Sequence, residues 1–215
     1  MVSFAALTLV AVLGAASSAQ SSSSGASPRE SFDELYRRGH QTGAGIQTLT
    51  ARFTETTTSS LLTRPLVARG TLAAQRPSRV VLRFTDPDER VVLIEGDRMT
   101  MSWPSRNLRQ VSNISSAQGR VQKYLANDSA TELRRQFDIE LRNPGERPGT
   151  YEVVLIPKRK QIRDTVTRLD LWVEPASFLL SAIRMTFASG DTKTMVFEDI
   201  APNVALEPDT FSVDR

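Results

Sequence analysis

The sequence predicts a mainly β protein of the α+β type, with a single curled antiparallel sheet of about eleven short strands. Apolar and polar residues alternate along most of the chain, and compact turn sequences with Pro, Gly and Asp separate the alternating runs. Between residues 114 and 136 the apolar residues instead take a helical spacing. Because a sheet of this size twists strongly, we expect an incomplete β-barrel whose helical insertion serves as a lid or plug.

The clearest strands follow one another between Gly70 and Pro104, where turns at residues 75–77, 86–88 and 95–97 separate them. The side chains expected on their inward face are large and apolar, and none of them is a usual nucleophile or metal ligand. We expect this face to hold an apolar ligand, although a stripe of Met and aromatic residues is equally typical of an ordinary core. The candidate ligand-binding residues are Leu72, Val80, Leu82, Phe84, Met99, Met101 and Trp103.

The same signals predict the remaining elements. Ser31 followed three residues later by Glu34 is a capping pattern, and it predicts a short amphipathic helix that ends near Gly43. Further strands are expected at residues 46–59, 66–74, 106–111, 137–142, 151–157, 167–174, 179–187, 192–199 and 210–213.

The helical insertion supplies the expected lid. Val121, Tyr124 and Leu125 share one helical face, and a second capping pattern begins at Ser129. These helices need an apolar surface to cover, and the simplest arrangement places them inside or across the mouth of the curved sheet. Tyr124 and Leu125 would then contact an apolar ligand from the lid side.

The N-terminus has the features of a secretory leader, with residues 1–19 as the signal peptide. Its apolar run is too short to span a bilayer as a stable anchor, but an uncleaved N-terminal anchor is the competing interpretation. Residues 20–30 form a polar, low-complexity linker that we expect to be disordered. One folded domain is therefore predicted over residues 31–215.

The composition argues against several classes of function. The chain has no cysteine, which excludes a disulfide framework, a thiol nucleophile and the lipid acceptor of a bacterial lipoprotein. The formal net charge is +3, but basic and acidic residues alternate, as in Arg83, Asp86, Arg90 and Asp97. This alternation is typical of a solvated face, so we predict no nucleic-acid partner.

An enzyme built on this sequence would have to rely on carboxylates. A glycosidase needs two of them, and neither His nor Cys is required. The acids available for such a pair are Glu95, Asp97, Glu152 and Asp170. None of the four stands in a distinctive motif, and the chain has neither a G-x-S-x-G element nor a phosphate-binding glycine loop. We therefore predict no catalytic site, no metal site and no cofactor.

Several short motifs follow one another in a distinctive order. A leading helix is followed by I-x-x-L-x-A-x-F, G-x-L, the Arg76-Pro77 turn, a D-P turn and a W-P pair. After the interrupting helix come Y-x-V-x-L-x-P and a closing F-x-x-x-x-x-N-x-x-L-x-x-x-x-F. No single motif is specific, but their order over residues 32–213 resembles the LolA family of periplasmic outer-membrane lipoprotein carriers.

The resemblance implies an incomplete antiparallel barrel with a helical lid and an apolar cavity for the acyl chains of a lipoprotein. It also implies that Arg76 contacts backbone carbonyls of the lid, around residues 121–125 and 133–137, and latches the empty cavity. A solvated turn residue is the alternative interpretation of Arg76.

The partners and location implied by the resemblance are those of a periplasmic monomer. Its partners would be lipidated proteins, an inner-membrane lipoprotein-release transporter and an outer-membrane acceptor. A LolA-like module that binds another amphiphile, or that senses envelope stress, remains the alternative.

Overall fold

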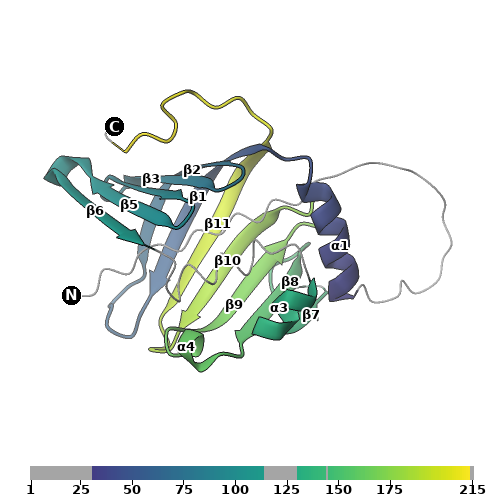
Figure 1. Cartoon of the computed structure of the whole chain (residues 1–215). Helices are drawn as coiled ribbons and strands as arrows, with labels where there is room; N and C mark the ends of the chain where they lie inside the picture. The colour runs from purple at the N-terminus through teal and green to yellow at the C-terminus, as the bar shows by residue number, and fades with distance from the viewer. Residues whose placement is uncertain (1–30, 114–129, 144, 214–215) are drawn as a thin grey trace.

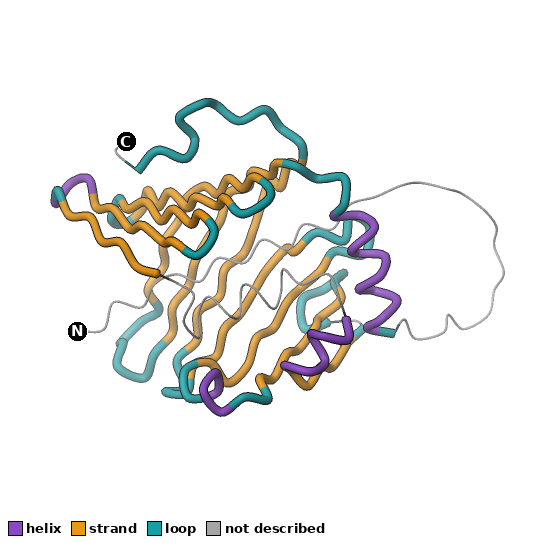
Figure 2. The backbone as a smooth tube through the Cα atoms, in the orientation of Figure 1, coloured by secondary structure: helices purple, strands orange, loops and turns teal. Residues whose placement is uncertain are grey.

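The computed structural model describes residues 31–113, 130–143 and 145–213. In this part of the chain, eleven strands form one antiparallel sheet in the order β6-β5-β4-β3-β2-β1-β11-β10-β9-β8-β7. The sheet is open and strongly curved (Figures 1 and 2), which confirms the predicted incomplete barrel. The strands are β1 (Thr48–Thr58), β2 (Leu66–Gln75), β3 (Arg79–Asp86), β4 (Arg90–Glu95), β5 (Arg98–Trp103), β6 (Leu108–Asn113), β7 (Phe137–Arg142), β8 (Tyr151–Pro157), β9 (Val166–Val173), β10 (Leu180–Phe187) and β11 (Thr192–Pro202).

Two meanders make up this sheet. Strands β1 to β6 follow one another in sequence order, as do β7 to β11, and the first strand of one meander pairs with the last strand of the other. In this β1/β11 pair, Phe53 lies opposite Phe197 and Glu55 opposite Met195. Because side chains alternate between the faces of a strand, this register aligns the two meanders into one continuous inner face.

The helices of the described residues are short. They are α1 (Phe32–Gly43), α3 (Ala130–Gln136), α4 (Lys160–Arg163) and the 3-10 turn η1 (Pro104–Arg106). The Ser31 hydroxyl accepts a hydrogen bond from the backbone N–H of Glu34 at 3.2 Å, as the capping pattern predicts. Arg134 of α3 donates to Asp33 of α1 at 2.9 Å, which ties the two helices together beside β7 (Figure 1).

The inner face of the sheet is the one turned toward α1 and α3. Phe32 and Leu35 of α1 and Leu133 of α3 pack into the same apolar cluster as the inner-face strand residues. This cluster takes residues from both meanders, so burial of its apolar surface holds the helices and both halves of the sheet together.

The outer face of β2, β3 and β4 is covered by the C-terminal segment. We predicted a strand at residues 210–213, and that prediction is wrong, because this segment turns across the sheet instead of pairing with it. Arg83 donates to the carbonyl oxygens of Thr210 and Ser212 at 3.0 and 2.7 Å, so a side chain satisfies carbonyls that a strand ladder would otherwise occupy. Phe211 is buried against this face.

Helical structure within the predicted insertion is confirmed only in α3. Residues 114–129, which include the expected Val121, Tyr124 and Leu125, lie outside the described part of the chain. The single turn of α4 between β8 and β9 was not predicted, because a four-residue helix with one buried residue, Ile162, shows no apolar period.

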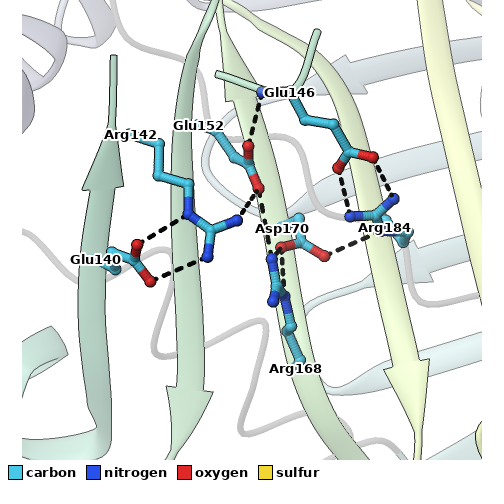
Figure 3. Close-up of polar contacts among 7 residues, drawn as sticks. All are labelled: Glu140, Arg142, Glu146, Glu152, Arg168, Asp170 and Arg184. Carbon is cyan, nitrogen blue, oxygen red and sulfur yellow. Dashed lines mark hydrogen bonds and ion pairs between the residues drawn. The ribbon is translucent and has the colours of Figure 1, made fainter. Parts of the chain in front are cut away.

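A network of ion pairs crosses the outer face of β7 to β10 (Figure 3). At its centre Glu152 and Asp170 are fully buried. Asp170 accepts hydrogen bonds from Arg168 at 2.6 Å and from Arg184 at 3.1 Å. The residues of this outer-face network are Glu140, Arg142, Glu146, Glu152, Arg168, Asp170 and Arg184.

The loop between β7 and β8 closes over this network. The backbone N–H of Glu146 donates to Glu152 at 2.8 Å, and the Glu146 carboxylate accepts from Arg184 at 2.7 Å. The hydrogen bond from Arg184, assisted by its charge, lowers the pKa of Glu146. The contact that the Glu146 carboxylate makes is therefore present at neutral pH and is lost only as the pH falls through that lowered pKa.

Replacing Gly70 by Ala should destabilise the protein strongly. A Cβ at this position would lie 2.0 Å from the backbone oxygen of Arg83 and 2.8 Å from the ring of Phe53. We expect Gly70→Ala to lower the free energy of unfolding by about 3 kcal/mol in urea titration. Gly45→Ala is the matched control, since its Cβ would meet nothing within 4 Å. Equal stability of the two variants would contradict the close packing of β2 on β3.

Replacing Asp170 by Asn should weaken its ion pairs with Arg168 and Arg184. We expect Asp170→Asn to cost about 2 kcal/mol of unfolding free energy, because it removes the charge of a fully buried carboxylate that two arginines share. Each arginine keeps a second partner, Glu152 for Arg168 and Glu146 for Arg184. Asp138→Asn is the matched control on the same face, since its ion pair with Lys158 is exposed and should contribute less than about 1 kcal/mol. Chemical denaturation of both variants measures the difference, and a cost below 1 kcal/mol for Asp170→Asn would be the wrong result for a buried network.

Candidate functional site

The seven residues predicted from the Gly70–Pro104 stretch all lie on the inner face. Leu72 is opposite Leu82 across β2 and β3, and Leu82 is opposite Val92 across β3 and β4. Each of the seven belongs to the large apolar cluster or packs against it, with Val80 and Trp103 only half-buried. The structure therefore brings the predicted residues together, and their contact with a ligand stays a prediction.

Gly70 makes room for the aromatic centre of this face. It lies opposite Phe53 on β1 and opposite Phe84 on β3. The two rings meet edge to face with their centroids 4.9 Å apart, in the space that a side chain at position 70 would fill. The G-x-L motif of the sequence thus has a packing reason.

The inner face extends beyond the residues that sequence analysis selected. The strands on the other side of the β1/β11 pair contribute apolar side chains of the same kind to the same cluster. Alternation along each strand could have indicated them, but only the sheet order shows that they continue the surface of the first meander. The additional inner-face residues of the second meander include Val153, Leu155, Leu169, Leu171, Ile183, Met185, Met195 and Phe197, and the first meander adds Phe53, Val92 and Ile94.

The lid side of the site is described only in part. Leu133 of α3 and Phe137 at the start of β7 are buried in the apolar cluster, next to α1. Tyr124 and Leu125, the two predicted lid contacts, lie outside the described residues, so their role stays a prediction.

Arg76 lies at the end of the sheet where α1 finishes. Its Nη2 donates to the backbone oxygen of Gly43, the last residue of α1, at 2.9 Å, and its backbone N–H donates to Gln47 at 2.9 Å. A cation at this place satisfies a terminal carbonyl of the helix and complements its dipole. The guanidinium of Arg76 therefore binds the end of α1. The expected lid residues 121–125 lie outside the described part of the chain.

A polar group interrupts the apolar surface of the inner face. Glu55 of β1 accepts hydrogen bonds from Lys193 of β11 at 3.1 Å and from Arg90 of β4 at 3.4 Å. The Arg90 guanidinium also stacks 3.7 Å above the ring of Phe84. We call these three residues the inner-face triad. The alternating pattern of β1 could have placed Glu55 on this face, but the sequence does not reveal its partners.

The four carboxylates considered for catalysis lie in two separate places. Glu152 and Asp170 come close together through Arg168, yet both are fully buried on the outer face. Glu95 is paired with Arg79 at 3.0 Å, and Asp97 is exposed in the turn between β4 and β5. Among residues 31–113, 130–143 and 145–213, no group of three acids or histidines could hold a metal ion.

Comparison with known proteins identifies the family. The model of the outer membrane lipoprotein carrier protein LolA family matches residues 44–214. The chain belongs to this family. The outer-membrane lipoprotein carrier protein of Pseudomonas entomophila is 24% identical over 168 residues, which cover 78% of each chain. The corresponding carrier of Pseudomonas paraeruginosa is 23% identical over 168 residues, 78% of this chain and 77% of the relative.

Solved structures resemble the chain more distantly. A LolA superfamily protein from Nitrosomonas europaea has a TM-score of 0.43 at 13% identity, covering 79% of this chain and 92% of its own. The family membership rests on the sequence match rather than on this likeness. The search for membrane spans was confined to the described residues, and it found no helix long and apolar enough to cross a bilayer.

Proposed function

We propose that the chain is a periplasmic carrier that shields the acyl chains of lipoproteins on the inner face of its sheet and delivers them to the outer membrane. The large apolar cluster of the inner face, shared by both meanders, is the observation that carries this proposal. Membership of a family of lipoprotein carriers supports it. In this proposal the chain binds and releases its cargo and performs no chemistry on it.

The energetics suit a carrier that takes chains from one membrane and returns them to another. Burial of one methylene contributes about 0.8 kcal/mol, so a chain of about sixteen carbons gains on the order of 12 kcal/mol relative to water. A membrane offers nearly the same gain. The inner face therefore needs to match the membrane, and a change in the protein has to decide between loading and release.

The remaining parts of the proposal are its location and partners. The carrier would follow export by a cleaved signal peptide and would act between an inner-membrane lipoprotein-release transporter and an outer-membrane acceptor. Relatives named as outer-membrane lipoprotein carriers support this placement.

A charge placed on the inner face should prevent loading. Val80 is a half-buried inner-face residue, so Val80→Asp can keep the fold while it exposes acyl chains to a carboxylate. We expect protein purified from its native envelope to carry lipidated protein detectable by mass spectrometry, and Val80→Asp to carry at least about tenfold less. Val67→Asp is the matched control, because Val67 is an exposed residue of the neighbouring strand β2. Recovery of a free glycolipid in place of lipidated protein would favour the alternative amphiphile carrier.

Removing the Arg76 guanidinium should separate loading from release. If the bond to Gly43 helps to hold the empty, closed state, its loss makes the open state less costly and bound chains harder to expel. We expect Arg76→Leu to load acyl chains normally and to pass them to acceptor membranes several-fold more slowly in a transfer assay. Arg98→Leu, which changes an exposed arginine near the same end of the sheet, is the control. Transfer at the wild-type rate would remove the latch role of Arg76.

A further inference from the structure

The inner-face triad of Glu55, Arg90 and Lys193 is buried in a surface that is otherwise apolar. The Glu55 side chain is only 5% exposed and that of Lys193 10%. Strand alternation places Glu55 on the same face as Phe53, and Lys193 on the same face as Met195. The triad therefore faces the space that the proposed function assigns to acyl chains.

The hydrogen bonding of the triad is incomplete. Both cations bind Oε1 of Glu55, whereas Oε2 is buried and has no hydrogen-bond partner. An unsatisfied buried acceptor is costly, and this cost is greatest when the acceptor is charged. Lys193 carries three N–H groups on its ammonium, and a single carboxylate oxygen does not use all of them. The triad thus presents both a free acceptor and free donors.

The triad also lies at one end of the inner face. Glu55 is near the end of β1 that leads into the β1–β2 hairpin, and Arg90 directly follows the turn between β3 and β4 at the same end of the sheet. Arg76 and the C-terminus of α1 lie at the opposite end, beside the start of β1. The apolar surface of the face extends between these two polar ends.

We propose that the inner-face triad is the subsite for the acyl linkage of the cargo. This subsite rests on the proposed function. In it, the acyl chains lie along the inner face toward α1, and the polar linkage lies at the β1–β2 hairpin end. There an amide N–H of an acylated peptide donates to Oε2 of Glu55, and its carbonyl oxygen accepts from Lys193 or Arg90.

The chemistry of the linkage explains why such a subsite is useful. Acyl chains of a lipidated protein and of a membrane lipid gain the same free energy of burial, so the apolar face alone cannot select between them. An N-acylated peptide carries an N–H beside its chain, which an ester-linked chain lacks. A site with a buried acceptor rejects the analogue that leaves that acceptor unpaired.

A pair of probes that differ in one group tests this subsite. The probes are N-palmitoylglycine methyl ester and its analogue in which an ester oxygen replaces the amide N–H. Their affinities for the full chain are measured by competition against a fluorescent fatty acid. We expect the wild-type protein to bind the amide at least about tenfold more tightly than the ester.

The double variant Glu55→Met/Lys193→Met removes the two most buried charges of the triad together. It leaves Arg90, whose side chain is 28% exposed and remains stacked on Phe84, so the fold should be kept. We expect it to bind the ester at least as well as the wild type does and to prefer the amide by less than about twofold. Lys160→Met/Asp164→Met is the matched control, because it removes an exposed ion pair of α4 and should keep the tenfold preference.

The outcomes separate the subsite from the carrier function. Equal binding of amide and ester by the wild type, or a preference that survives in the double variant, overturns the subsite and leaves acyl-chain binding intact. If the fluorescent fatty acid and both probes all fail to bind, the proposed function fails and the subsite fails with it.

Discussion

The pairing of β1 with β11 is the constraint on which the rest of the structure depends. It joins residues near position 50 to residues near position 200 and turns two local meanders into one sheet. The loop-closure entropy of this long-range contact is repaid only when both strands present their apolar faces to the same side. A slip of one residue would turn Phe53 and Glu55 to the outer face. The register of this single pair thus decides which side chains form the inner face.

The two faces of the sheet are buried by different kinds of contact. The outer face is closed by the protein itself, through the buried network around Asp170 and through the C-terminal segment that Arg83 holds. Those contacts are directional and saturate the groups that make them. The inner face is held by apolar contact, which is not directional, and the proposed function depends on this property.

Local patterns explain how far the sequence alone could lead. Alternation and turn residues predicted the sheet and its apolar inner residues, because both signals act within a few positions along the chain. The segment at residues 210–213 alternates between polar and apolar residues as a strand does. Its carbonyl oxygens nevertheless accept hydrogen bonds from Arg83, which lies more than a hundred positions away in the sequence. The Glu55–Lys193 pair spans 138 positions. Contacts of that kind depend on sheet order and register, which no local pattern contains.

The inner-face triad changes what the apolar surface can do. Hydrophobic burial contributes a free energy that grows with chain length and is nearly equal in a membrane, so it neither selects a cargo nor drives its release. Selection requires a group that is satisfied by one ligand and left unpaired by another, and Oε2 of Glu55 has this property. In the proposed carrier, release requires a competing state of the protein, and the bond from Arg76 to the end of α1 is the contact expected to stabilise that state. The two polar ends therefore supply what the apolar surface between them lacks.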